Sequence, residues 1–385
     1  MHVRRRIAAG TLLAVAALAA WHVRRSEAAS RTPAVRRAAT DTALGGRLTV
    51  PSGFRMNYYA NGIRGIRFMT IGPDGAVYAT VPGSGRVIRL PDDNHDGFAD
   101  SMSVVAEGLN RPHGLVFHKG FLYVANTDGV VRMQLANGRA TSAPVYVNHY
   151  ESGGGHWTRT IIFGADSAMY VSVGSTCNIC VEKSDERAAV LRFNEDGSGK
   201  RVYASGLRNA VGIAVYPATK QIWASQNERD DIKPEHENLP PEEINILVDG
   251  GDYGWPYCYG NRVPNPEFND AARCARTIPP ALEMQAHSAP LGISFLDRAT
   301  KFPADWRGDL LVAFHGSWDR AVPTGAKVVR VRIQNGKPVA ADDFITGWQG
   351  ADGKRWGRPV DIVVAPDGAV LISDDAGGSV YRVVH

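Results

Sequence analysis

The sequence predicts an all-β protein, and more specifically a six-bladed β-propeller. Three observations lead to this prediction. The chain combines 44% hydrophobic residues with 41 glycines and 22 prolines, a composition that favours many short elements and turns over long helices. A pair of β-rich stretches joined by a turn recurs six times, and most pairs are followed by a third such stretch. Three or four strands per repeat are typical of a propeller blade.

The six pairs share one internal order, an apolar strand, a turn and a second strand. They are FMTIGPDGAVYAT (68–80), HGLVFHKGFLYVAN (113–126), RTIIFGADSAMYVSVG (159–174), VGIAVYPATKQIWAS (211–225), LGISFLDRATKFPADWRGDLLVAF (291–314) and VDIVVAPDGAVLISD (360–374). Turns such as PDG and ADS between strands rich in Val, Ile, Tyr and Phe are hairpin signals. Because six recurrences in one order rarely arise by chance, the propeller is favoured over two β-sandwiches with accidental similarity.

A third β-rich stretch follows most pairs and would complete the blade. These stretches are GRVIRL (85–90), GVVRMQL (129–135), AAVLRF (188–193), KVVRVRI (327–333) and SVYRVV (379–384). Successive repeats are spaced by 44, 46, 52, 80 and 69 residues, counted between Thr70, Gly114, Thr160, Gly212, Gly292 and Asp361. The later intervals exceed the length of one blade, so we expect a propeller domain over 44–385 with an insertion at 227–290.

The N-terminal segment has the layout of an export signal. MHVRRR precedes an uncharged apolar run over 7–21, and small residues follow it. The run is shorter than the ~20 residues of a membrane span, which favours cleavage, whereas Arg24 and Arg25 near the expected cut leave an uncleaved anchor open. We therefore expect residues 1–29 to be a signal peptide or N-terminal anchor and residues 30–43 to be a linker.

Export would place the chain in the periplasm or outside the cell, with membrane contact only if the N-terminal segment is uncleaved. In an oxidising compartment the four cysteines predict disulfides rather than metal ligands. The expected pairs are Cys177–Cys180 and Cys258–Cys274. The stretch Cys177-Asn-Ile-Cys180-Val is not followed by the histidine of a CxxCH motif, so no covalently attached haem is expected.

The charge of the chain argues against a nucleic-acid partner. The formal net charge is +4 over 385 residues, and no block of Lys and Arg follows the N-terminal segment. Proteins that bind nucleic acid through their charge carry a much stronger basic patch.

Polar residues recur at the two positions of each repeat that should face the propeller axis. The loop entering the innermost strand and the loop leaving the second strand lie on the same face, so their residues converge. Entering the inner strands are Arg111, His113, His156, Arg159, Arg208, Asn209, His287 and Arg358; leaving the second strands are Asn126, residues 226–229, His315, Asp374 and Asp375. Each alone is most simply a hydrogen-bonded loop residue. Together, several imidazoles and guanidiniums predict shifted pKa values or, more simply, an anionic cofactor or substrate.

Six motifs resemble, in the same order, those of the soluble quinoprotein sugar dehydrogenases, and most closely the L-sorbosone dehydrogenase-like branch. They are HWTRT (156–160), LRNAVGIA (207–214), SQNERDD (225–231), EEINILVDGGDYGWP (242–256), FHGSWDR (314–320) and GRPVDIVVAPDG (357–368). The similarity extends from about Gly62 to the C-terminus. The family is a six-bladed propeller that binds pyrroloquinoline quinone and calcium on its axis, so the resemblance implies the same fold and cofactors here.

The resemblance also implies roles for single residues. His156 matches the general base that takes the substrate hydroxyl proton while a hydride passes to C5 of the quinone, and Arg208 matches the arginine beside the C5 oxygen. A neutral imidazole can accept that proton, and a fixed guanidinium can stabilise the developing negative charge. Arg358 suits a forked pairing with a quinone carboxylate. The residues expected to contact the cofactor are His113, Arg159, Asn209, His287, His315, Arg358 and Asp375.

The sequence departs from the better-known family members at four positions. Their calcium is held partly by backbone oxygens of a Gly-Pro pair, where this chain has Glu228 and Arg229. Because a carbonyl ligand does not depend on the side chain, we still expect these two backbone positions to hold the catalytic calcium. His113 replaces a glutamine that contacts the cofactor, and the region of His315 replaces a lysine, which removes a fixed positive charge.

A second calcium site is suggested by the acidic segment 92–100. Its oxygen-bearing side chains alternate and Gly97 stands at the sixth position, as in a calcium loop. The twelfth position is Ser103, which lacks the usual bidentate carboxylate, so a structural calcium and a solvated acidic turn between blades are equally supported. The candidate ligands are Asp92, Asn94, Asp96 and Asp100.

The predicted function is oxidation of a sugar, sugar alcohol or aldehyde, with electrons passed to an external quinone or cytochrome. Two alternatives use the same fold. A propeller hydrolase such as a lactonase would hold a metal with carboxylate and Asn side chains at the inner-strand entries, where this chain has His and Arg. A non-catalytic binding propeller would use its rim loops, and its ligand binding would survive loss of His156 and Arg208.

Overall fold

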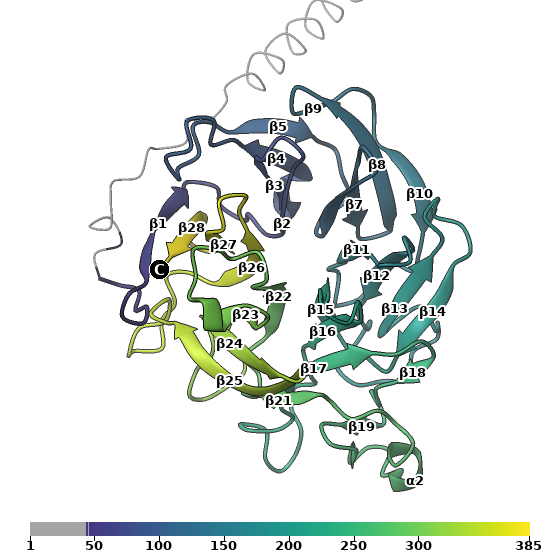
Figure 1. Ribbon diagram of the computed structural model, residues 1–385. Helices are drawn as coiled ribbons and strands as arrows, with labels where there is room; N and C mark the ends of the chain where they lie inside the picture. Colours follow the sequence, from purple (N-terminus) through teal and green to yellow (C-terminus); the bar gives the residue numbers. More distant parts are fainter. Residues whose placement is uncertain (1–43, 45) are drawn as a thin grey trace, which may run out of the picture.

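The computed structural model describes residue 44 and residues 46–385 and is built almost entirely of strands (Figure 1). Six sheets of four or five strands stand in a ring, and each sheet is one blade. The first strands of all six blades contact their neighbours around the ring and so surround the axis. The predicted all-β, six-bladed propeller is confirmed.

In blades 1 to 5 the strands follow the chain outward from the axis, and in blade 6 the first three do. Blade 1 contains β2 (Met69–Ile71), β3 (Val77–Val81), β4 (Arg86–Leu90) and β5 (Ser103–Ala106). Blade 2 contains β6 (Leu115–His118), β7 (Phe121–Asn126), β8 (Gly129–Ala136), β9 (Arg139–Ala140) and β10 (Val145–His149). Blade 3 contains β11 (Ile161–Phe163), β12 (Met169–Val173), β13 (Ala189–Phe193), β14 (Arg201–Ser205) and β18 (Gly251–Asp252). Blade 4 contains β15 (Ala210–Val215), β16 (Ile222–Gln226), β17 (Glu242–Leu247) and β21 (Leu282–Met284). Blade 5 contains β22 (Pro290–Phe295), β23 (Leu310–Phe314), β24 (Lys327–Gln334) and β25 (Lys337–Ile345). Blade 6 contains β26 (Pro359–Val364), β27 (Val370–Asp374), β28 (Ser379–Val384) and β1 (Arg55–Ala60). Outside the blades lie η2 (Pro82–Ser84), β19 (Cys258–Tyr259), β20 (Val263–Pro264), α2 (Ala271–Cys274) and η3 (Ala304–Trp306).

The ring is closed by its two ends. β1 pairs antiparallel with β28, the last strand of the chain, with Arg55 opposite Val384 and Tyr58 opposite Tyr381. The outer strand of blade 6 therefore comes from the beginning of the described chain. Separating the first and last blades would break this pairing, so it holds the ring together.

Packing between neighbouring blades provides the hydrophobic core. Buried apolar side chains form six clusters; five of them join two adjacent blades, including the last blade and the first, and the sixth joins blades 1 and 2 and extends across the axis to Val211, Leu291 and Val360. The second strands β12, β16, β23 and β27 are buried along their whole length, because they lie inside their sheets and between neighbouring blades. This burial explains why the second half of each repeat reads as a nearly continuous apolar run.

The predicted insertion at 227–290 is only partly an insertion. β17 and β21 belong to blade 4, and β18 extends blade 3. The excursion outside the blades carries β19, β20 and α2 and is closed by the Cys258–Cys274 disulfide. Both predicted disulfides are present, the second being Cys177–Cys180.

The predicted signal peptide or anchor (1–29) and the predicted linker (30–43) lie outside the described residues. Within the described part of the chain, none of the helices is both long and apolar enough to cross a membrane.

Candidate active site

A cavity of about 290 Å³, lined largely by polar and ionisable residues, opens at the axis on the face where the inner strands begin. Its wall is made by loops that enter inner strands and loops that leave second strands, as the repeat pattern predicts. The predicted residues that line it are His156, Arg208, Asn209, Glu228, His287, His315 and Arg358. A larger cavity of about 770 Å³ runs along the inner strands, but its lining is mostly apolar. The ionisable side chains are concentrated in the smaller cavity.

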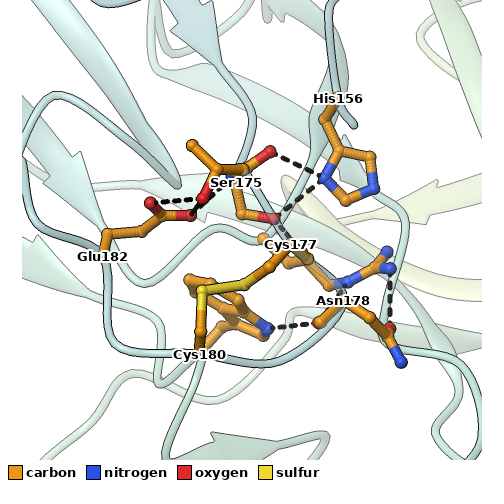
Figure 2. The surroundings of a disulfide bond; sticks show 9 residues. His156, Ser175, Cys177, Asn178, Cys180 and Glu182 are labelled. Atoms are coloured by element: carbon orange, nitrogen blue, oxygen red, sulfur yellow. Dashed lines mark hydrogen bonds between the residues drawn. A yellow bond between two sulfur atoms is a disulfide. The ribbon is translucent and has the colours of Figure 1, made fainter. Parts of the chain in front are cut away.

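His156 is held in one tautomer by the chain around it. Its Nδ1 lies 3.0 Å from the Ser175 carbonyl and 2.8 Å from the Ser175 hydroxyl, as Figure 2 shows. The carbonyl can only accept, so Nδ1 carries the proton, and the hydroxyl donates its own proton to the Cys177 carbonyl at 2.7 Å. The other ring nitrogen, Nε2, is left unprotonated and can accept a proton.

The surroundings of His156 keep its ring neutral. Burial, and then the positive charge of Arg208, lower the pKa of His156 to about 3. Both effects disfavour the charged imidazolium. At neutral pH the ring is therefore unprotonated at Nε2.

Arg208 presents a fixed positive charge next to this base. Its side chain is only 4% exposed. Nε donates to the Asn178 carbonyl at 3.0 Å, Nη2 donates to Asn178 Oδ1 at 2.9 Å, and Nη1 donates to the Glu228 carbonyl at 2.6 Å. Asp230 lies 3.3 Å from Nη2 and partly balances the charge. A guanidinium held in this way can stabilise negative charge without reorganising.

The Cys177–Cys180 loop contacts Ser175, the partner of His156 (Figure 2), and itself contains Asn178, a partner of Arg208. The Cys177 carbonyl accepts from Ser175, which orients His156, and Asn178 binds Arg208 twice. Sequence reasoning found the disulfide but not the supporting roles of Ser175 and Asn178. The signal was present, because these residues directly follow β12 and so leave the second strand of blade 3.

A second charged group forms the opposite wall. Arg358 donates to the carbonyls of His315 at 2.9 Å and Gly316 at 2.8 Å. His315 Nε2 lies 3.0 Å from Asp375 Oδ1, and Asp375 also pairs with Arg67 at 2.5 Å. Burial lowers the pKa of His315 to about 4, so its ring is neutral at neutral pH. Arg67 lines the cavity and supplies a positive charge there. This charge makes up for the family lysine that is replaced in the region of His315.

Three predicted cofactor contacts lie behind the cavity wall. His113, Arg159 and Asp375 are not among the lining residues. His113 is fully buried and packs on Phe68, with ring centres 4.1 Å apart. Arg159 is fully buried and donates to the carbonyls of His156 and Thr158, each at 2.8 Å. In this structure these side chains support the residues that face the cavity.

The expected calcium positions are placed differently from one another. Glu228 lines the cavity, and its carbonyl accepts from Arg208. Arg229 does not line the cavity, and its buried guanidinium pairs with Glu267 at 2.6 Å. Beside them Glu242 is buried, which raises the pKa of its carboxyl to about 8. Calcium held by the backbone of Glu228 and Arg229 stays a prediction.

The acidic segment 92–100 forms a turn whose carboxylates bind the turn's own amides. Asp92 accepts from the backbone of Asp96 and Gly97, each at 3.0 Å. Asp100 accepts from the backbone of Asp93 at 2.7 Å and from the Asn94 amide at 2.8 Å. Among the described residues the segment does not gather three carboxylate ligand atoms within 4.8 Å of one another. A structural calcium at Asp92, Asn94, Asp96 and Asp100 also stays a prediction.

Comparison with known proteins identifies the family. The model of the TrAA12-like family matches residues 48–385. The chain belongs to the TrAA12-like family. This assignment confirms the resemblance to soluble quinoprotein sugar dehydrogenases that the six motifs indicate.

Relatives of this TrAA12-like protein match most of its length. It is 29% identical over 359 residues to an uncharacterized protein of Borreliella burgdorferi, covering 88% of this chain and 91% of that protein. It is 26% identical over 411 residues to a pyrroloquinoline quinone-dependent pyranose dehydrogenase of Coprinopsis cinerea, covering 88% of this chain but only 54% of that longer protein. The holo structure of the pyrroloquinoline quinone domain of Coprinopsis cinerea pyranose dehydrogenase superposes with a TM-score of 0.75 at 24% identity, covering 88% of this chain and 97% of the domain. The shared propeller thus accounts for nearly all of that domain.

Proposed function

We propose that this TrAA12-like protein is a pyrroloquinoline quinone-dependent dehydrogenase that oxidises a sugar, a sugar alcohol or an aldehyde and passes the electrons to an external acceptor. The observation that carries the proposal is the pairing of a neutral, tautomerically fixed His156 with a fixed Arg208 in one axial cavity. The pyranose dehydrogenase of Coprinopsis cinerea supports the same cofactor and substrate class.

The cavity suits a flat, anionic quinone that carries carboxylates. Arg67, Arg208 and Arg358 bring three guanidiniums to its wall, and Asn209 adds an amide. Nε of Arg67 is buried and has no hydrogen-bond partner among the described residues. Trp318 lines the cavity although its surface is 72% exposed, which places a flat ring where a planar ligand can stack.

Each residue near the reacting atoms has a defined task. When bound, pyrroloquinoline quinone would supply the hydride acceptor at its C5 carbon. His156 would accept the substrate hydroxyl proton on Nε2, and Ser175 would keep that nitrogen directed away from the protein. Arg208 would keep a positive charge where negative charge develops during the transfer.

Two further features belong to this proposal. We place a calcium ion at the backbone oxygens of Glu228 and Arg229 on the basis of the family resemblance alone, since the Glu228 carbonyl accepts a hydrogen bond from Arg208 and Arg229 does not line the cavity. We also propose that the protein is exported to the periplasm or secreted. The two disulfides support that location, because such bonds persist in oxidising compartments.

A reconstitution assay tests the proposed function. Purified protein loaded with pyrroloquinoline quinone and calcium should reduce an artificial electron-accepting dye when aldoses or related alcohols are added. His156→Ala should lose this activity while still binding the quinone, as measured by absorbance. Dye reduction that is equally fast in the variant, or a wild-type protein that fails to bind the quinone, would refute the proposal.

A further inference from the structure

Three side chains from blades 4 and 5 meet at the edge of the axial cavity. Asp230 follows β16, His287 precedes β22 and Asp319 follows β23. Their ligand atoms all lie within 4.8 Å of one another. His287 Nδ1 is 3.5 Å from Asp230 Oδ1 and 4.0 Å from Asp319 Oδ2. Asp230 and His287 also line the cavity, so this cluster borders the space that a ligand would fill.

The far side of the His287 ring fixes which nitrogen faces the carboxylates. Nε2 lies 2.9 Å from the Leu239 carbonyl and is also within hydrogen-bond distance of the His236 carbonyl. Carbonyl oxygens only accept, so Nε2 carries a proton and Nδ1 is directed at Asp230 and Asp319. A carbonyl behind the ring is the usual support of a metal-bound histidine, because it fixes the tautomer and the ring orientation.

Asp319 is a buried carboxylate that accepts no hydrogen bond among the described residues, and His287 is its charged neighbour. Its side chain is 8% exposed, and neither of its oxygens has a hydrogen-bond partner among the described residues. Leaving a buried carboxylate without donors is costly. Arg208 lies next to Oδ2 of Asp230, 3.3 Å away, which leaves Asp230 Oδ1 facing His287. A cation between Asp230, His287 and Asp319 would satisfy these oxygens.

We propose that Asp230, His287 and Asp319 bind one divalent transition-metal ion of the Zn²⁺ or Mn²⁺ type at the edge of the axial cavity. One imidazole nitrogen with two carboxylate oxygens suits such ions, whereas calcium and magnesium prefer oxygen ligands alone. With bonds of ~2.1 Å, ligand atoms of a tetrahedral zinc site lie roughly 3.4 Å apart, so the observed spacing needs little adjustment.

This ion is separate from the expected calcium and does not depend on the proposed dehydrogenase function. The calcium is assigned to backbone oxygens of Glu228 and Arg229, whereas the transition-metal site uses three side chains. Because Asp230 and His287 face the cavity, the ion would keep a coordination position open to water or to a bound ligand.

Calorimetric titration of the purified full chain, treated with a chelator and kept free of quinone, tests the site. A non-reducing buffer keeps Cys177 and Cys180 joined, so that their thiols cannot bind metal. Zn²⁺ or Mn²⁺ should bind at one ion per chain, and Ca²⁺ should bind at least about tenfold more weakly. Asp319→Asn should weaken Zn²⁺ or Mn²⁺ binding at least about tenfold. The matched control Asp342→Asn, at an exposed carboxylate on β25, should bind like the wild type.

Thermal unfolding separates loss of the site from loss of the fold. Since neither Asp319 oxygen is hydrogen-bonded in the described structure, metal-free Asp319→Asn should be at least as stable as the metal-free wild type. The metal should raise the melting temperature of the wild type and of Asp342→Asn, but not that of Asp319→Asn. Absence of binding, equal binding by folded Asp319→Asn, or a preference for Ca²⁺ would overturn the proposal.

Discussion

Asn178 links the disulfide loop to the charge of Arg208, and its replacement by alanine tests whether that link matters for catalysis. Its Oδ1 accepts from Arg208 Nη2 and from the Asp230 backbone, each at 2.9 Å. Arg208 would keep its bonds to the carbonyls of Asn178 and Glu228. A hydrogen bond to a charged group contributes about 1.5–3 kcal/mol, and about 1.4 kcal/mol corresponds to a tenfold change. We therefore expect Asn178→Ala to lower kcat/KM by about 10- to 150-fold, toward the lower end because other bonds remain.

Steady-state dye reduction by reconstituted protein measures this effect. The control is Asn261→Ala, an exposed asparagine that does not line the cavity, which should change kcat/KM less than about twofold. Circular dichroism and a melting curve would show that both variants fold. If folded Asn178→Ala stays within twofold of the wild type, the idea that the disulfide loop fixes Arg208 for catalysis is wrong.

Three further predictions address the base, its titration and the disulfides. His156→Ala should reduce kcat by about 10²- to 10⁴-fold in the same assay, because a general base contributes that much, and an unchanged kcat would exclude this role. The pKa of His156 is lowered to about 3, so its ring is neutral above that pH. Between about pH 8 and pH 5, kcat/KM should therefore not fall through protonation of this base. A fall in kcat/KM centred near the ordinary pKa of histidine would contradict this. Removal of the Cys258–Cys274 disulfide, whose cysteines are 16 residues apart, should lower the free energy of unfolding by roughly 3 kcal/mol and lower the activity only a little. Removal of the Cys177–Cys180 disulfide, whose cysteines are 3 residues apart, should lower the free energy of unfolding by roughly 2 kcal/mol and lower the activity much more. Urea unfolding and dye reduction together measure this contrast, and equal losses of activity would refute it.

The repeats predicted the fold because each hairpin is a local signal. β1 was missed because its partner is β28, at the other end of the chain, and no nearby stretch reveals that pairing. β17 was missed because it lies within 227–290, which the spacing of the repeats assigned to an insertion, and because it begins with the charged residues Glu242 and Glu243. Both are only 2% exposed, and their burial depends on contacts that spacing does not encode.

The same pattern predicted on which face of the propeller the site lies, but it did not predict which side chains reach the cavity and which are buried behind its wall. Residues that enter inner strands do converge, which placed His156, Arg208 and Arg358 correctly on the cavity wall. The rule cannot tell a side chain that reaches the cavity from one that turns into the loop behind it, as Arg159 does. Arg67 and Asp319 were missed although each stands at a position that the repeat pattern marks as facing the axis. Arg67 precedes the inner strand of blade 1, and Asp319 follows the second strand of blade 5.

Absorbance titration with pyrroloquinoline quinone, in the presence of calcium, tests whether the axial cavity binds the cofactor. One quinone should bind per chain. Arg358→Ala should weaken binding at least about tenfold, because it removes a positive charge from the wall. Arg332→Ala on the outer surface of β24, with its side chain 47% exposed, should leave binding unchanged. No spectral change with the wild type, or equal binding by Arg358→Ala, would contradict the assignment of this cavity to the cofactor.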